Sequence, residues 1–262
     1  MIQYIFLSHD VDWPRQGAPV EHILARKDRF DEEAIKNLHV KNPYYNIPEI
    51  MELEEKFGIR TTFFFRTIYE NGNYLDYEND IYSLIKGGWE IGLHSDPSSV
   101  ENIDKLRREK KSLENLTGKK ILANRVHYLK TNSELPRKLQ NLGFVYDSSV
   151  KKFKDTIEPD DMNYYMIDKL IEFPITIMDA YLFTYMKIEE NQIVNTFARM
   201  LETVKTSSLH NDFSVMSVLW HDNVLKMKGG RAYAKILEYL TSQDNVRILR
   251  GIDLAEIIHR NY

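Results

Sequence analysis

The chain has 262 residues, 43% of them hydrophobic and 28% charged, and a formal net charge of −4. This is the composition of an ordinary globular protein, without the basic surplus expected of a nucleic-acid-binding domain. No apolar run approaches the ~20 residues of a transmembrane helix. Cysteine is absent, which excludes disulfides, thiolate catalysis and thiolate-bound zinc. No leader with a basic start and an apolar core is visible, so we expect a cytoplasmic location.

Short runs typical of β-strands alternate with helical patterns along the chain. The strand-like runs are rich in β-branched and aromatic residues and occupy residues 2–8, 59–66, 89–94, 119–127, 143–149, 171–178, 213–221 and 245–251. The spacing of apolar residues, together with capping signals, predicts helices over residues 47–57, 102–116, 133–143, 189–206, 230–240 and 253–260. Such alternation favours parallel strands joined by crossover helices. Seven or eight strands of this kind predict an α/β barrel rather than an open sheet.

One long polar stretch interrupts the alternation. Residues 14–45 follow the first strand-like run and contain three prolines, so we interpret them as an insertion. Long connections in compact domains are usually functional lids or mobile segments. We therefore expect the insertion to form a lid or a subunit contact. No repeat, low-complexity tract or linker divides the chain, which predicts a single catalytic domain over residues 1–262.

Acidic and imidazole side chains gather where the strand-like runs end. In a parallel barrel these ends meet on one face, and functional residues lie there. The polar and aromatic residues at the ends of the runs are His9, Asp10, Asp12, His94, Ser95, Asp96, Arg125, His127, Tyr128, Asp147, Ser148, Asp179, Trp220, His221 and Asp222. A single polar residue at such a place usually caps a turn. Convergence of carboxylate and imidazole from several strands instead suits Zn²⁺ and similar divalent ions.

Five short motifs in this set resemble those of polysaccharide deacetylases, the carbohydrate esterase family four type with the nodulation-deacetylase homology domain. In chain order the motifs are SHDVD, HSDPS, RVHYL, YDSS and VLWH, and the run TTFFF is similar to the family's second strand. The resemblance implies a distorted (β/α) barrel with about seven parallel strands. It also implies a metal-dependent hydrolase that removes an N-acetyl group from an acetamido sugar in a polysaccharide or glycan intermediate.

The same resemblance implies roles for individual residues. Asp10 corresponds to the catalytic base, Asp12 and His94 to ligands of a divalent metal, most simply Zn²⁺, and His221 to the general acid. Arg125 is expected to orient Asp10 by a charge-assisted hydrogen bond and to keep it ionised.

Four further residues are expected to contact the substrate or to hold the catalytic groups in place. The backbone N–H near Tyr128 would face the oxyanion, and Asp179 would face the cleft. Asp147 would anchor the fourth motif or support Arg125. Trp220 would form part of the cleft wall, because sugars stack on indole faces.

The second motif departs from the family pattern, because Ser98 replaces its second histidine. Three outcomes are open. His127 supplies the missing imidazole, or Ser98, Asp96 or water completes a weaker site, or the site holds no metal. A serine hydroxyl is a poor zinc ligand, which favours His127.

Two other functions remain open beside N-deacetylation. One is metal-independent hydrolysis of another C–N bond, in a cyclic amide or ureide, since relatives of this fold catalyse such reactions. The other is sugar binding by a catalytically degenerate protein. If the enzyme is cytoplasmic, its substrate would be a free, nucleotide-linked or lipid-linked glycan intermediate rather than mature cell wall.

Overall fold

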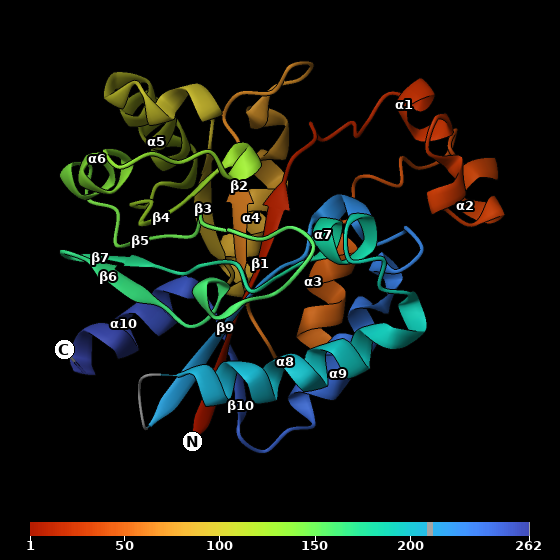
Figure 1. Ribbon diagram of the computed structural model, residues 1–262. Helices are drawn as coiled ribbons and strands as arrows, with labels where there is room; N and C mark the ends of the chain where they lie inside the picture. The colour runs from red at the N-terminus through yellow and green to blue at the C-terminus, as the bar shows by residue number, and fades with distance from the viewer. Residues whose placement is uncertain (209–211, 262) are drawn as a thin grey trace.

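The protein is described by a computed structural model that covers residues 1–208 and 212–261 (Figure 1). Within these residues, ten strands form one curled sheet, and helices lie around its outside. The strands are β1 (Ile2–Val11), β2 (Thr62–Phe65), β3 (Glu90–Ser95), β4 (Ala123–Val126), β5 (Tyr146–Asp147), β6 (Tyr165–Ile167), β7 (Leu170–Glu172), β8 (Ile177–Met178), β9 (Phe213–Leu219) and β10 (Val246–Leu249).

The strand order of the sheet is β6-β7-β5-β4-β3-β2-β1-β9-β8, with β10 beside β1. Every pairing between these strands is parallel except that of β6 with β7. A curled and mostly parallel sheet of this kind is a distorted (β/α) barrel, so the predicted fold class is confirmed. The antiparallel strand β6 was not predicted, because its three residues are short and partly exposed.

The predicted run at residues 171–178 forms two short strands instead of one. Pro174 interrupts it, because proline has no N–H to donate to a neighbouring strand. On either side of the break the backbone remains bonded: Phe173 N–H donates to Asp147 O at 2.9 Å, and Thr176 N–H donates to Ser217 O at 2.9 Å. Since β7 pairs with β5 and β8 pairs with β9, this segment connects the two ends of the sheet.

Six helices agree with the predicted ones to within a few residues, namely α3 (Ile47–Lys56), α5 (Ile103–Thr117), α6 (Leu135–Asn141), α8 (Ile193–Ser207), α9 (Tyr233–Thr241) and α10 (Gly251–Asn261). Four were not predicted, namely α1 (Val20–Leu24), α2 (Glu32–Lys36), α4 (Glu78–Gly87) and α7 (Asp179–Thr184). Among the residues described, no helix has the length and apolarity needed to cross a membrane. The cytoplasmic location therefore stays a prediction.

Strand β1 is central to the arrangement of the site. It pairs with β9 on one side, and with β10 and then β2 on the other. Side chains alternate between the two faces of a strand. Asp10 therefore faces the interior of the barrel, where it contacts β3 and β4. Its neighbour His9 faces outward and contacts α3 and α9.

The insertion folds into a lobe that contains α1 and α2 and stands beside the barrel in Figure 1. An aromatic cluster fixes its base, because the rings of His22 and Tyr44 pack edge-on against Trp13, at centroid distances of 4.5 and 5.3 Å. A backbone bridge joins Phe30 to Met227 in the loop that follows β9. The insertion is thus an ordered element attached next to the ends of β1 and β9.

Candidate active site

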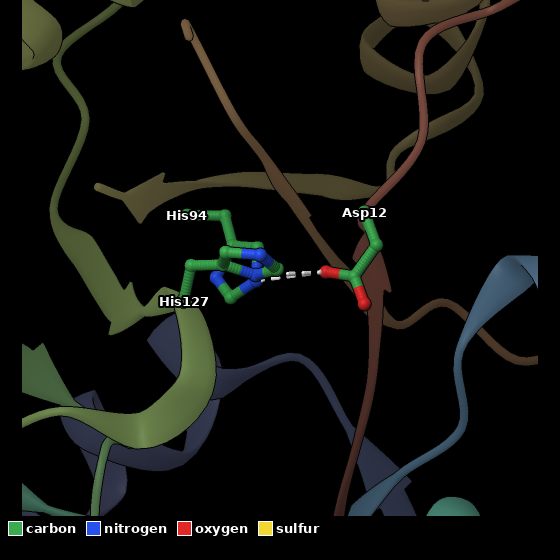
Figure 2. A group of neighbouring side chains, drawn as sticks. All are labelled: Asp12, His94 and His127. Atoms are coloured by element: carbon green, nitrogen blue, oxygen red, sulfur yellow. Dashed lines mark hydrogen bonds and ion pairs between the residues drawn. The ribbon is translucent and has the colours of Figure 1, made fainter. Parts of the chain in front are cut away.

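A carboxylate and two imidazoles converge at the carboxyl ends of β1, β3 and β4. Asp12 follows β1, His94 belongs to β3, and His127 directly follows β4. His94 Nε2 lies 3.1 Å from Asp12 Oδ1. His127 Nδ1 lies 3.2 Å from the same oxygen and 3.1 Å from His94 Nε2. Figure 2 shows both rings directed at the carboxylate, and we call these three residues the ligand cluster.

The ligand cluster fits a divalent cation. His94 Nδ1 donates to Arg125 O at 3.0 Å, which leaves a lone pair on Nε2. Burial lowers the pKa of His127 and so favours the neutral imidazole that binds metals. Burial raises the pKa of Asp12, but both imidazoles outweigh it and hold that pKa well below its usual value. Tetrahedral zinc would place neighbouring ligand atoms about 3.3–3.5 Å apart, so the observed spacing needs only a slight expansion.

Ser98 takes no part in the ligand cluster. It is exposed, and its hydroxyl donates to Asp96 Oδ1 at 2.6 Å and accepts from Lys105. Asp96 also forms an ion pair with Lys105 at 2.8 Å. These contacts hold Ser98 and Asp96 in a surface turn. Of the three outcomes that the sequence leaves open, the geometry favours His127 as the third ligand.

Asp10 lies beside the ligand cluster as an ionised carboxylate. Its Oδ1 accepts a hydrogen bond from Arg125 Nη1 at 2.8 Å, and its Oδ2 lies 3.6 Å from His94 Nε2. Burial raises the pKa of Asp10, but the Arg125 guanidinium outweighs this effect and lowers the pKa below its usual value. Among the described residues, no side chain or backbone N–H donates a hydrogen bond to Oδ2. Asp10 is therefore placed to accept a proton.

Arg125 is fully buried and held on several sides. Its Nε donates to Ser148 O and its Nη2 donates to Ser148 Oγ, both at 2.8 Å. Its Nη1 donates to Ser8 Oγ at 2.9 Å as well as to Asp10. The guanidinium also lies 4.4 Å from the centre of the Phe64 ring. The predicted support of Asp10 by Arg125 is present, and Ser148, one of the strand-end residues to which the sequence assigned no role, is an additional support.

His221 faces the ligand cluster from the end of β9. Its Nδ1–H donates to Asp179 Oδ1 at 2.7 Å, and its backbone N–H donates to Asp179 Oδ2 at 2.6 Å. Its Nε2 lies 3.6 Å from Asp12 Oδ2. Burial disfavours the charged ring, but the Asp179 carboxylate outweighs burial and raises the pKa of His221 to about 10. The ring is therefore held as an imidazolium, and its Nε2–H points toward the ligand cluster.

The structure corrects the prediction that Trp220 forms part of the cleft wall. Trp220 is fully buried, and its ring packs among Phe183, Phe197 and Tyr233, so it cannot offer a face to a sugar. Its position just after β9 places it on the outer face, whereas the following residue faces the barrel interior.

Asp147 also lies outside the cleft. It pairs in register with Asn124 on the outer face of the sheet, while Arg125 and Ser148 occupy the inner face. Its Oδ1 accepts from Asn124 Nδ2 at 2.8 Å and from Ser149 Oγ at 2.7 Å. Asp147 therefore anchors its strand and does not contact Arg125 directly.

Tyr128 lies at the edge of the site. Its side chain is 80% exposed, and its ring centre lies 3.9 Å from that of His127. Both Tyr128 and Leu129 have positive φ angles, of 60° and 53°, in the left-handed region that such residues rarely adopt. Strain of this kind persists where the surrounding structure enforces it. The ring of Tyr128 is free to contact a bound substrate.

Three residues that the sequence did not identify hold the exit of β1. Tyr69 hydroxyl donates to Val11 O at 3.0 Å, Arg66 Nη1 donates to Asp12 O at 3.1 Å, and Tyr77 hydroxyl donates to Trp13 O at 2.7 Å. These three consecutive carbonyls are thereby fixed, which sets the position of the Asp12 side chain. The donors come from the irregular segment after β2, where no motif or periodicity marks them.

His9 belongs to a separate buried network. Its Nε2 lies 2.7 Å from Glu54 Oε1 and its Nδ1 lies 2.6 Å from Trp220 O. Glu54 also accepts hydrogen bonds from Tyr233 and Trp89. This network ties β1 to α3 and α9, so His9 is not part of the ligand cluster.

A cavity of about 470 Å³ opens beside the ligand cluster. Its lining includes Asp12 and His221 together with the aromatic side chains of Trp13, Tyr44 and Phe183. A larger cavity of about 830 Å³ lies between α2 and α3, and its lining includes no residue of the ligand cluster. The smaller cavity is therefore the candidate substrate site.

Comparisons with known proteins give matches among solved structures. A protein from Mycobacterium smegmatis assigned as a polysaccharide deacetylase is 16% identical, with a TM-score of 0.70 over 99% of this chain and 91% of that one. One from Pseudomonas aeruginosa PAO1 with the same assignment is 14% identical, with a TM-score of 0.71 over 99% of this chain and 92% of the other. The chain has the polysaccharide deacetylase fold.

The PuuE allantoinase has this fold too, at 14% identity and a TM-score of 0.71 over 99% of this chain and 91% of that one. Neither the family models nor the curated protein sequences include a match. The similarity is therefore one of fold, and the resemblance drawn from the five motifs is confirmed at that level. Within the polysaccharide deacetylase fold of this chain, the ligand cluster lies at the carboxyl ends of the strands, where function is expected.

Proposed function

We propose that the protein is a metal-dependent hydrolase that removes an N-acetyl group from an acetamido sugar. The observation that carries this proposal is the placement of the ligand cluster between an ionised carboxylate, Asp10, and an imidazolium, His221. Amide hydrolysis needs a proton acceptor for the attacking water and a proton donor for the departing nitrogen. Solved structures of the same fold that are assigned as polysaccharide deacetylases support the choice of reaction.

Asp12, His94 and His127 would hold the cation. Two imidazoles and one carboxylate are a donor set that suits Zn²⁺ and leaves a position open. A cation bound there supplies a Lewis acid that lowers the pKa of a water molecule and polarises the acyl oxygen. The hydrogen bond from His94 Nδ1 to Arg125 O fixes the ring and its tautomer, as the outer hydrogen bonds of metal-bound histidines commonly do.

Asp10 is the proposed proton acceptor. Its Oδ1 is occupied by Arg125, so Oδ2 is the oxygen available to take a proton from water. Arg125 has a second effect, because it keeps the carboxylate ionised in a buried position. His221 is the proposed proton donor, acting through Nε2, while Asp179 holds the opposite side of the ring. We expect the backbone N–H at Tyr128 to face the developing oxyanion.

The acetamido sugar would bind in the cavity next to the ligand cluster. Trp13, Tyr44 and Phe183 are aromatic side chains in its wall that take the place of the predicted Trp220. A volume of about 470 Å³ is within the usual range of small-molecule sites. This substrate assignment rests on the fold and the wall chemistry together.

A second candidate is hydrolysis of another C–N bond, in a cyclic amide or ureide, without a metal. The similarity to an allantoinase structure favours it as the alternative. The two candidates differ in their response to metal removal. If the protein is an N-deacetylase as proposed, acetate release from N-acetylglucosamine derivatives should stop after chelation and return when Zn²⁺ is added. Activity on a ureide that survives chelation would favour the alternative.

Substitution of the proton acceptor separates catalysis from binding. Asp10→Asn should abolish acetate release and leave metal binding largely intact, because Asp10 lies outside the ligand cluster. A wild-type protein that binds sugar but releases no acetate in the presence of Zn²⁺, Mn²⁺ or Co²⁺ would refute the proposal and favour a non-catalytic sugar-binding role.

A further inference from the structure

The candidate substrate cavity extends from the ligand cluster to the insertion. Asp12 and His221 belong to its lining, and the insertion contributes several more lining residues. Further lining residues come from α7 and from the segment between it and α8. A substrate whose acetamido group reaches the ligand cluster would therefore extend toward the side chains of the insertion.

Besides His221, four cationic side chains line this cavity. Arg26 and Arg29 come from the insertion, Lys187 follows α7, and Lys228 lies in the loop after β9. The lining contains a single carboxylate, that of Asp12. We call the four cations the cationic wall.

No member of the cationic wall forms an ion pair with any residue in the described part of the chain. Arg26 Nη1 donates to the backbone oxygen of His22 at 3.2 Å, and Lys228 Nζ donates to that of Asp28 at 3.1 Å. The nearby Arg231 differs, because it pairs with both an aspartate and a glutamate. Arg26 is half-buried and the other three are exposed, so all four are available to an anionic group that enters the cavity.

The positive charge acts inside the cavity. Burial lowers the pKa of His22, and Arg26 and Arg29 lower it further. The same two guanidinium groups oppose the effect of burial on the pKa of Tyr44, which lines the cavity as well. The insertion thus places its charge over the space that a substrate would occupy.

We infer that the substrate of this enzyme is a sugar joined to a phosphate or diphosphate group, which binds the cationic wall while the acetamido group meets the ligand cluster. This inference rests on the proposed hydrolase function and specifies its substrate. Guanidinium groups bind phosphate oxygens through paired hydrogen bonds. A diphosphate carries enough negative charge to match several cations, whereas one carboxylate or a neutral polysaccharide would leave most of them unpaired. The insertion then has a defined role, since it supplies Arg26 and Arg29.

Binding of pyrophosphate to the metal-loaded protein tests the cationic wall without turnover. Titration calorimetry would compare the wild type with Arg26→Gln/Arg29→Gln. We expect the double variant to bind at least about tenfold more weakly, the loss expected from even one charge-assisted contact. Metal content must be equal in both proteins, because pyrophosphate also binds metal ions and neither arginine belongs to the ligand cluster.

A matched control is Lys56→Gln/Lys226→Gln, which removes the same charge from the separate cavity of about 830 Å³. We expect this control to bind pyrophosphate within about twofold of the wild type, since general charge effects at a distance are screened by salt. The inference would be overturned if the Arg26→Gln/Arg29→Gln variant bound pyrophosphate as tightly as the wild type. It would also be overturned if the control variant lost as much pyrophosphate affinity as the Arg26→Gln/Arg29→Gln variant.

Acetate release identifies the source of the phosphate. The substrates are N-acetylglucosamine 1-phosphate, uridine diphosphate N-acetylglucosamine, a polyprenyl diphosphate-linked N-acetylglucosamine in phosphatidylcholine vesicles, and the neutral N-acetylglucosamine tetramer. We expect the kcat/KM of at least one phosphorylated substrate to exceed that of the tetramer by about tenfold or more. The Arg26→Gln/Arg29→Gln variant should lose this advantage, mainly because its KM for the phosphorylated substrate rises. Turnover of the soluble uridine diphosphate compound would indicate a nucleotide carrier, and turnover of the vesicle-bound compound would indicate a lipid carrier.

The two proposals fail in different ways. Equal acetate release from the tetramer by the wild type and by the double variant, with no preference for phosphate, would overturn the anion site and leave the hydrolase function standing. Arginine-dependent binding of pyrophosphate without acetate release from any substrate would support the anion site and refute N-deacetylation.

Discussion

Removal of the Arg125 side chain should strongly destabilise the protein. Arg125 is fully buried, and it donates to the Asp10 carboxylate, to two serine hydroxyls and to a backbone oxygen. In Arg125→Met the volume of the side chain is roughly kept, but the Asp10 charge remains buried without its partner. Breaking a buried pair in this way costs about 3–5 kcal/mol. For a chain of this size the loss corresponds to a fall in Tm of about 5–10 °C.

The assay is thermal and urea unfolding with excess EDTA, so that metal binding does not contribute to the stability. Asp10→Asn should also destabilise, because it leaves the guanidinium unpaired. The double variant Asp10→Asn/Arg125→Met should be less destabilised than the sum of the single variants by about 2 kcal/mol or more.

Arg137→Met is the matched control. Arg137 pairs with Glu134 at 2.6 Å, but its side chain is 76% exposed. An exposed pair of this kind contributes little, so the control should unfold within about 0.5 kcal/mol of the wild type. If Arg125→Met lies within about 1 kcal/mol of the wild type, or if the two single variants are additive, our account of the buried charges is wrong.

Two further predictions concern the chemistry and the cleft. Asp179→Asn should lower kcat about 10²-fold or more with little change in KM, because the group that charges and orients His221 is lost; an unchanged kcat in steady-state assays of acetate release would contradict that role. Trp13→Ala should raise KM for the sugar substrate, whereas Trp220→Phe should lower Tm and leave KM unchanged, because Trp220 packs in the core. A raised KM in Trp220→Phe would restore the sequence prediction that this side chain contacts substrate.

Much of the fold could be predicted because strand and helix periodicities alternate so regularly. Where the observed elements differ from the predicted ones, the physical reasons are local. Pro174 splits the run at 171–178, and α4 (Glu78–Gly87) begins directly after the short 3₁₀ helix Tyr74–Tyr77, so no separate capping signal marks its first residue. The hairpin strand β6 is short and partly exposed, so it lacks the apolar pattern that identifies a buried strand.

Those site residues that lie on or directly after a strand could be predicted, because the alternation of side chains along a strand sets the face on which each one lies. Asp10 and Asp12 differ by two positions and therefore face the same side, and the ends of parallel strands bring His94 and His127 to the same edge. Register also explains why Asp147 has only the anchoring role of the two that were expected for it. Asp147 and Ser148 are adjacent at the same strand end, so their side chains face opposite sides of the sheet. Ser148 is therefore the residue that contacts Arg125.

Contacts from irregular segments could not be predicted. Arg66, Tyr69 and Tyr77 bind the carbonyls at the end of β1, but their positions depend on how the chain turns after β2. The third ligand position was open for a similar reason, because the sequence places Ser98 and His127 on neighbouring turns without showing which one points inward. The structure turns Ser98 toward Asp96 and His127 toward His94.

Metal content measured by mass spectrometry tests the central claim most directly. After equilibration with Zn²⁺ and removal of excess metal, the wild type and Ser98→Ala should each retain one ion per chain, whereas His94→Ala and His127→Ala should lose most of it. Loss in Ser98→Ala with full retention in His127→Ala would contradict the assignment of the third ligand. Full occupancy in His94→Ala would show that the cation, if bound, lies somewhere other than the ligand cluster.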